Sequence, residues 1–274
     1  MKYLIIIFFQ AFFVLGSAQT QLDSTKLENN LFHPTPKKLM RSFETDRPDV
    51  TESPFTVDVG HFQFETDLFK TDHSKVDGVK TIQNYFNAAN LKLGITNSMD
   101  LQFIVETFVT QKITDGTFTQ KKSGIGNLSI RVKQNIWGND NGKTALAILP
   151  FVIIPTTQNA KITGGLIIPL SISFPGDWEF GTEIETDIEE NQLKTGYHIS
   201  NLVSATISHQ LFRKCDFFLE SLASRNNELR SNDYTINFGL IYELEKNFNI
   251  DSGIYYGLRA TSSKVYFIGL SFRY

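Results

Sequence analysis

The last eleven residues, KVYFIGLSFRY from Lys264 to Tyr274, decide the fold class. Successive side chains of a strand point to opposite faces. One face here is apolar and carries Tyr266, Ile268, Leu270, Phe272 and Tyr274. The other face is mostly small or polar and carries Phe267, Gly269, Ser271 and Arg273. A long terminal strand with an aromatic last residue is typical of outer-membrane β-barrels, in which the last strand pairs with the first. We interpret Phe272 and Tyr274 as the membrane-insertion signal, and keep a soluble β-sandwich as the alternative.

The composition agrees with an exported barrel. Hydrophobic residues make up 41% of the 274 residues and the mean hydropathy is −0.16, values that a barrel reaches because half of each strand is polar. The net charge of −3 argues against a nucleic-acid partner. The single cysteine, Cys215, excludes a disulfide scaffold and a cysteine-rich metal site.

Three regions follow one another along the chain. Lys2, an apolar run and Gly16-Ser17-Ala18 predict a signal peptide over residues 1–18. Residues 19–58 are polar and rich in proline, which predicts a periplasmic lead-in containing a candidate plug. Residues 59–274 are expected to form the barrel.

Alternation of apolar and polar residues predicts about twelve antiparallel strands in a closed, all-β transmembrane barrel. Tight links alternate with wider ones, of which 71–81 and 112–123 are the first two. An even strand count places both termini at the short-turn rim, which faces the periplasm of a Gram-negative bacterium. Pro150 and Pro169 fall inside predicted strands, so we expect a bulge or a local break in pairing at each.

An acidic, proline-containing segment precedes the first strand. We call the residues from Glu44 to Pro54 the ribbon, because neither a helix nor a central strand accommodates its two prolines. The sequence TDRPDVTESPFTVDVGHFQFE, from Thr45 to Glu65, resembles the entry motif of a bacterial family labelled "transporter" and named for a meta-pathway of phenol degradation. A second stretch, SGIGNLSIRVKQNIW from Ser123 to Trp137, resembles another landmark of that family. The resemblance implies an outer-membrane barrel with a transport role.

Charged residues on the predicted inward face are the candidates for lining the lumen. They are Glu65, Glu106, Arg131, Lys133, Glu179, Glu183, Glu185, Asp187, His198, Glu243, Asp251 and Arg273. Such groups either pair in a salt-bridge network or form a selectivity site. The four acids of residues 179–187 repel one another and need a cation or basic groups nearby.

We expect the ribbon to fold into the lumen as a partial plug, with docking on the periplasmic rim as the alternative. Its acids Asp46, Asp49 and Glu52 would meet Arg131, Lys133 or Arg273. Arg47 would meet the acids of residues 179–187. Charges paired in a narrow lumen are screened less than surface pairs, so this docking needs no apolar core.

These features predict a channel that passes small apolar or amphipathic solutes and is not an enzyme. A nonconductive structural or surface-binding barrel, or a lipid-modifying membrane enzyme, are the alternatives. His198 and Ser200 are the least implausible catalytic pair, but no nucleophile motif, cofactor motif or metal-ligand spacing is present. The expected partners are outer-membrane lipid, the barrel-assembly machinery and a small solute.

Overall fold

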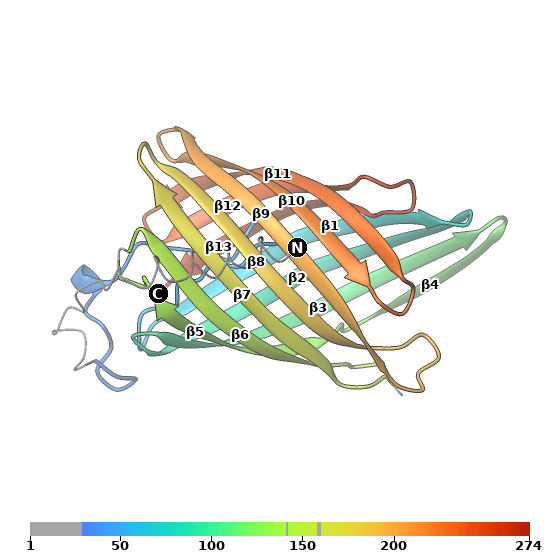
Figure 1. Ribbon diagram of the computed structural model, residues 1–274, viewed down its shortest axis with the longest axis horizontal. Helices are drawn as coiled ribbons and strands as arrows, with labels where there is room; N and C mark the ends of the chain where they lie inside the picture. Colours follow the sequence, from blue (N-terminus) through green and yellow to red (C-terminus); the bar gives the residue numbers. More distant parts are fainter. Residues whose placement is uncertain (1–28, 141, 158–159) are drawn as a thin grey trace, which may run out of the picture.

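The chain forms one closed, antiparallel β-barrel in the computed structural model, which describes residues 29–140, 142–157 and 160–274 (Figure 1). The elements are η2 (Lys37–Leu39), β1 (Phe62–Val76), β2 (Val79–Thr96), β3 (Met99–Asp115), β4 (Phe118–Gly124), β5 (Leu128–Trp137), β6 (Thr144–Ile154), β7 (Thr163–Phe174), β8 (Trp178–Glu190), β9 (Tyr197–Phe212), β10 (Cys215–Asn226), β11 (Ser231–Glu245), β12 (Phe248–Gly257) and β13 (Lys264–Arg273). The predicted signal peptide, residues 1–18, lies outside the described residues.

The thirteen strands occupy twelve positions around the barrel. β4 and β5 both pair with β3, β4 against Val109–Asp115 and β5 against Met99–Val105. They are therefore two parts of one wall position, separated at the Gly126 region, where the backbone N–H of Gly126 donates to the carbonyl of Glu106. The predicted closed barrel of about twelve strands is confirmed.

The final strand closes the barrel against the first. β13 pairs with β1 from Arg273, opposite Gln63, to Lys264, opposite His73. The backbone N–H of Tyr274 donates to the carbonyl of Phe62 at 2.9 Å and extends this ladder. The first and last strands of the wall therefore leave no open edge along this seam, as a lipid environment requires.

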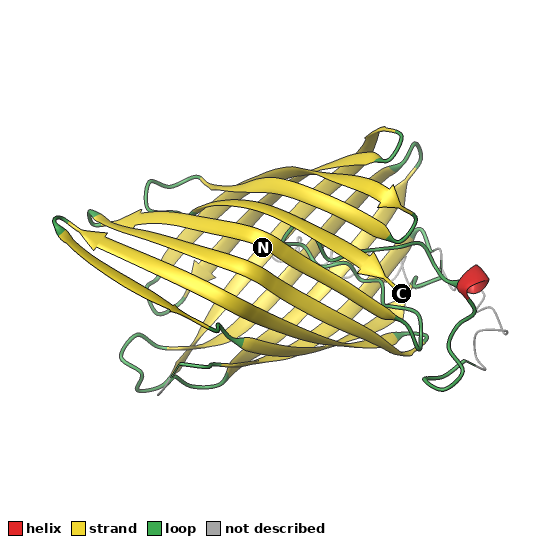
Figure 2. Cartoon of the chain, turned by 180° about the vertical axis from the view of Figure 1, so that it is seen from behind, coloured by secondary structure: helices red, strands yellow, loops and turns green. Residues whose placement is uncertain are grey.

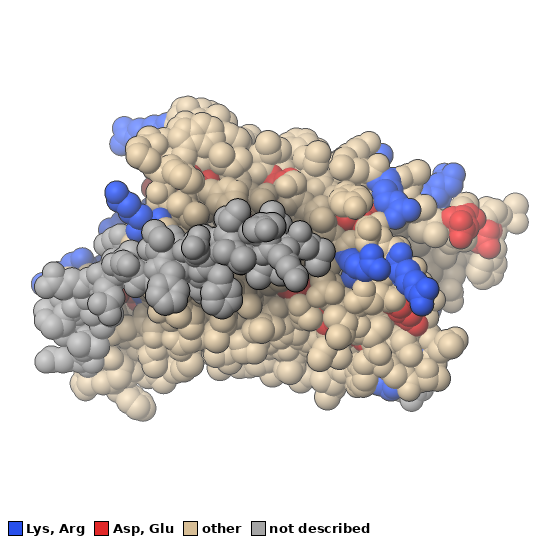
Figure 3. Space-filling view, viewed as in Figure 1, with Lys and Arg blue, Asp and Glu red and all other residues tan. Residues whose placement is uncertain are grey.

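The two faces of the wall differ as the alternation predicts. Tyr266 and Ile268 are 43% and 49% exposed, whereas the adjacent Phe267 is 6% exposed. Lys and Arg lie mainly toward the two ends of the face that Figure 3 shows. No helix in the described part of the chain is long and apolar enough to cross a membrane.

Two predicted loops are paired strands instead. The hairpin of β1 and β2 continues to a two-residue turn at Asp77-Gly78, where both residues have positive φ (49° and 87°). The hairpin of β3 and β4 likewise continues to Gly116. The predictions of wide loops over 71–81 and 112–123 were therefore wrong, because polar residues pair well in strands that project beyond a membrane. Both hairpins extend past the rest of the wall, at the end opposite the C-terminus (Figure 1).

Both prolines interrupt a ladder, as expected. Between β5 and β6, pairing stops after Arg131–Phe151 and resumes at Gln134–Ile148, which leaves Pro150 unpaired on that side. Between β6 and β7, Pro169 lies in a similar gap. The inward side of this region is apolar and buried; it consists of Ala147, Leu149, Phe151 and Ile167.

Candidate functional site

The ribbon runs inside the barrel and touches strands on opposite walls. It enters at the end where the C-terminus lies (Figures 1 and 2). At this entrance Val59 forms a parallel bridge with Gly94 of β2. The approach is so close that a side-chain carbon on Gly94 would lie 2.1 Å from the carbonyl oxygen of Asp58. Glycine is therefore needed where the incoming chain crosses β2.

A basic pair holds the entrance. Arg41 Nε donates to Asp58 Oδ1 at 3.0 Å, and Arg41 Nη1 donates to the carbonyl of Asn97 at 2.9 Å. Arg273 Nη2 donates to the carbonyl of Arg41 at 2.8 Å, and its Nη1 to that of Ser42 at 3.2 Å. Arg273 thus binds the backbone leading into the ribbon, whereas it was expected to pair with a ribbon acid.

Asp46 forms the centre of a buried charge network. Its Oδ1 accepts from Lys133 Nζ at 2.5 Å, and its Oδ2 accepts from Lys92 Nζ. Lys92 also contacts the carboxylate of Glu65, which in turn accepts from the backbone N–H of Asp46 at 3.2 Å. Burial opposes ionisation, but the Lys133 and Lys92 ammonium groups hold the pKa of Asp46 well below its usual range. Asp46 is therefore a fixed anion between β2 and β5.

Arg47 joins the ribbon to the seam where the barrel closes. Its Nη1 donates to Asp67 Oδ1 at 2.6 Å and its Nη2 to Asp251 Oδ1 at 2.7 Å. Nε donates to Asp251 Oδ2 at 3.2 Å, so the bond to Asp251 is bidentate. Although burial opposes the charged form, the Asp67 and Asp251 carboxylates raise the pKa of Arg47 further. The expected pairing of Arg47 with the acids of residues 179–187 was wrong.

The next residues of the ribbon bind carboxylates on the facing wall. The backbone N–H of Thr51 donates to Glu220 Oε1 at 2.7 Å, and its hydroxyl lies 2.6 Å from Ser204 Oγ. The backbone N–H of Glu52 donates to Glu183 Oε2 at 2.7 Å, while the Glu52 carboxylate accepts from Arg131. Burial and the neighbouring Asp46 raise the pKa of Glu52 to about 7, despite Arg131. Residues of β5, β8, β9 and β10 thereby hold the two consecutive residues Thr51 and Glu52 in place.

Asp49 has no basic partner among the described residues, contrary to the expectation that Arg131, Lys133 or Arg273 would neutralise it. Burial and the nearby Glu220 carboxylate instead raise the pKa of Asp49 well above its usual range. Ionisation of Asp49 therefore opposes docking of the ribbon against the wall.

The remaining predicted residues lie apart from the ribbon network or only border it. Glu106 accepts from the backbone N–H of Asn127 at 2.9 Å and so shapes the junction of β4 and β5. Among the described residues, Glu185 and Asp187 form no hydrogen bond or ion pair with the ribbon. Glu179 lines a cavity together with ribbon residues.

Four wall residues that hold the ribbon were missing from the predicted pairings: Asp67, Lys92, Glu220 and Asp251. Asp251 was predicted to face inward, but no partner was predicted for it. Lys92 and Glu220 each stand between outward residues of a strand, as in Leu91-Lys92-Leu93. A lone charge in an alternating strand is the signal that could have revealed them.

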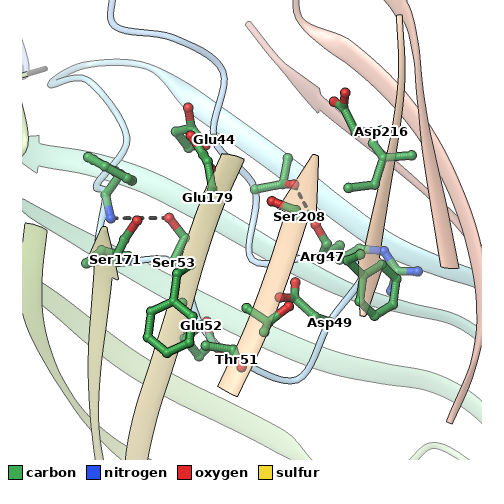
Figure 4. A pocket seen from close by; sticks show the side chains of 18 of the residues that line it. Glu44, Arg47, Asp49, Thr51, Glu52, Ser53, Ser171, Glu179, Ser208 and Asp216 are labelled. Atoms are coloured by element: carbon green, nitrogen blue, oxygen red, sulfur yellow. Dashed lines mark hydrogen bonds between the residues drawn. The ribbon is translucent and has the colours of Figure 1, made fainter. Parts of the chain in front are cut away.

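A cavity of about 490 Å³ remains between the ribbon and strands β7 to β11 (Figure 4). Its acidic lining includes Glu44, Asp49, Glu52, Asp177, Glu179 and Asp216, and its aromatic lining includes Phe43, Phe55, Phe180 and Phe218. Glu44 lies beside Glu179 (Figure 4), and burial together with Glu179 raises the pKa of Glu44 to about 7. The cavity therefore combines carboxyl groups with aromatic surface.

The candidate catalytic pair is engaged elsewhere. Ser200 Oγ donates to Glu189 Oε2 at 2.7 Å. His198 Nε2 lies 2.9 Å from Asn226 Nδ2 and 3.0 Å from Glu189 Oε2. The serine hydroxyl thus faces a carboxylate, which gives no serine–histidine dyad of the kind that activates a nucleophile.

A closed antiparallel barrel with an apolar outer face and a charged lumen defines an outer-membrane type of β-barrel. The chain belongs to the family described as "Putative MetA-pathway of phenol degradation", whose model matches residues 45–274. No curated protein sequence matches the chain.

Solved structures share this fold at low sequence identity. The COG4313 outer membrane channel from Pseudomonas putida F1 is 10% identical, with a TM-score of 0.59 over 84% of this chain and 100% of that one. The translocator domain of the autotransporter NalP from Neisseria meningitidis is 12% identical, with a TM-score of 0.51 over 78% and 88%. The NanC porin is 12% identical, with a TM-score of 0.50 over 76% and 98%. The likeness shows the fold of an outer-membrane β-barrel.

Proposed function

We propose that the protein is an outer-membrane channel for small apolar or amphipathic solutes, and that the ribbon is a displaceable plug that restricts passage. The observation that carries this proposal is the docking of Asp46 and Arg47. Their side chains bind β2, β5, β1 and β12, on both sides of the lumen. Polar docking of this kind holds a segment without an apolar core and can be released without unfolding the wall.

The cavity beside the ribbon supports the choice of solute. Its phenylalanine rings suit an apolar body, and its carboxyl groups suit a hydrogen-bond donor or a cationic group. The apolar inward residues of β6 and β7, among them Leu149 and Ile167, would extend the apolar side of the path when the ribbon moves away.

The proposed setting is the outer membrane of a Gram-negative bacterium, with both termini in the periplasm. The short turns and the end of β13 lie at one rim, and the long hairpins lie at the other, as in barrels whose termini are periplasmic.

Reconstitution tests the function directly. The mature chain, purified in detergent and identified as folded by a heat-dependent shift on a gel, is placed in planar bilayers and in liposomes. We expect measurable conductance, and faster entry of small aromatic amines and alcohols than of sugars of equal size. A folded barrel without conductance or uptake would favour a structural or surface-binding role.

Passage is expected to increase as the pH rises from 5 to 7.5. Docked Glu44 has a pKa of about 7, against an ordinary 4.5, so the docked ribbon binds this proton more tightly than the released ribbon. Docking is therefore strongest at low pH and weakens as Glu44 ionises. Glu44→Gln should reduce the rise in conductance, while Glu52, whose pKa is also about 7, still ionises in this range. Glu245→Gln, at an exposed position near the same rim, is the control, and an unchanged profile in Glu44→Gln would contradict this account.

Removing the aromatic end of β13 is expected to impair assembly in cells. The Phe272 ring lies 5.3 Å from that of Phe64 across the closing seam, and Tyr274 extends the ladder to Phe62. Phe272→Ser combined with deletion of Tyr274 should lower the amount of folded barrel in the outer membrane severalfold, as expected for a signal read by the assembly machinery. Leu258→Ser, on an exposed apolar residue after β12, is the control. Equal amounts of both variants would oppose this role of the terminus.

A further inference from the structure

The two projecting hairpins carry an unusual row of lysines. Lys75 pairs with Lys80 across β1 and β2, and Lys112 pairs with Lys121 across β3 and β4. The ladder between β2 and β3 places Ile82 opposite Lys112, two residues from Lys80. Since paired residues of a ladder share a face, all four lysines lie on one face of this four-stranded extension. All four are exposed.

That face continues the outer, lipid-facing surface of the barrel. Thr71 of β1 pairs with Tyr266, which is 43% exposed, and His73 pairs with Lys264. Along β13 toward the tips of the hairpins, the residues on this face are Ile268, then Tyr266 and then Lys264. An apolar, then aromatic, then cationic order matches the passage from hydrocarbon through the interface to the headgroups of a bilayer. Two residues of strand cover about 7 Å, so the lysines begin one headgroup layer beyond the aromatic belt.

No anion of the described part of the chain neutralises this row. Like charges directly opposite each other destabilise a sheet, and here two such pairs share one face. None of the four lysines forms an ion pair with a described residue. Lysines that only guard a sheet edge would be expected on edge strands. Lys75 and Lys121 do lie at edges of this extension, since the ladder of β1 with β13 ends at His73 and β4 pairs with β3 alone among the described strands. Lys80 and Lys112 lie on β2 and β3, which have neighbours on both sides, so edge protection accounts for only half of the row.

We propose that this lysine face binds the phosphate groups of a phosphorylated glycolipid in the outer leaflet. Ammonium groups bind phosphate as point charges, and basic clusters beside a membrane span attract anionic headgroups. A lipid whose acyl chains rest against Ile268 and whose sugar phosphates reach Lys75, Lys80, Lys112 and Lys121 satisfies both the apolar and the cationic parts of this face. The inference does not depend on conduction through the lumen.

Native mass spectrometry of the mature chain with added lipid A measures this binding. The test variant is Lys75→Gln with Lys80→Gln, Lys112→Gln and Lys121→Gln. The control removes the same charge from exposed positions at the other rim, by Lys38→Gln, Lys143→Gln, Arg213→Gln and Lys246→Gln. We expect the test variant to bind lipid A at least about tenfold more weakly than the wild type and the control. The wild type should bind dephosphorylated lipid A as weakly as the test variant binds the intact lipid.

Three results would overturn the proposal. They are equal binding by the test and control variants, equal loss in both, and wild-type binding that is unaffected when the phosphates are removed. A heat-dependent gel shift checks that each variant folds. All eight residues are exposed, so their substitution is not expected to unfold the barrel, and a loss of lipid A binding is not explained by misfolding.

Discussion

Linking residue 51 to residue 204 by a disulfide is expected to stop most passage of small solutes, and reduction is expected to restore it. The hydroxyls of Thr51, on the ribbon, and Ser204, on β9, lie 2.6 Å apart and both side chains are buried. Cysteines at these positions therefore lie close enough for a disulfide. The variant is Thr51→Cys with Ser204→Cys and Cys215→Ser, which removes the natural thiol.

The size of the effect follows from the docking equilibrium. A disulfide typically stabilises the linked state by about 2–4 kcal/mol, which lowers the released population by roughly thirtyfold or more. Liposome uptake of a small aromatic amine, before and after reduction, measures it. Thr186→Cys with Asn201→Cys, also in the Cys215→Ser background, links two strands that already pair directly, so it serves as the control. Passage that is the same in the oxidised and reduced forms of the test variant would show that solutes move beside a stationary ribbon.

The wall of the barrel could be predicted from the sequence because its pattern is local. In the last strand, the period of two assigns Tyr266 and Ile268 to the exposed face and Phe267 to the buried face, as observed. The prolines were equally informative, because the loss of a backbone donor does not depend on distant residues. Interrupted pairing at Pro150 and Pro169 follows from the residue type alone.

Strand ends were less predictable than strand centres. Residues 71–81 and 112–123 are mostly polar, so they were predicted to be loops on the assumption that each strand ends at the membrane boundary. The hairpins do not end there, since backbone pairing continues in water as long as a compatible turn is available. Asp77-Gly78 provides that turn through two positive φ angles.

The partners of the ribbon could be predicted by charge but not by position. Lys133 and Arg131 do bind ribbon acids, because inward cations beside inserted carboxylates have few other partners. Arg47 does not meet the acids of residues 179–187, although they form the largest cluster. It meets Asp67 and Asp251, because the ribbon passes the closing seam at that height. The level along the barrel axis at which the ribbon crosses the lumen depends on the folded barrel and cannot be predicted from the local sequence.

Replacing Arg47 by alanine is expected to open the channel more than any other single substitution in the ribbon. Its guanidinium lies between two carboxylates and over the Phe267 ring, at 5.5 Å from the ring centre. Removing one partner of a buried ion pair typically costs about 3–5 kcal/mol, since the remaining charge stays buried without compensation. That loss raises the released population of the ribbon by roughly a hundredfold or more. Single-channel recording should show longer or more frequent openings, and liposomes should leak small solutes faster.

Asp49 supplies the comparison that separates plug release from general damage to the lumen. It lies only two residues after Arg47 in the ribbon, yet its charge faces Glu220 and no base among the described residues. Asp49→Asn removes a repulsion, so it should leave conductance unchanged or lower it. Arg225→Ala, at an exposed arginine whose Nε donates to Asn227, controls for the loss of an arginine elsewhere. If Arg47→Ala folds as judged by heat-dependent mobility and conducts like Arg225→Ala, the ribbon is not the element that restricts the channel.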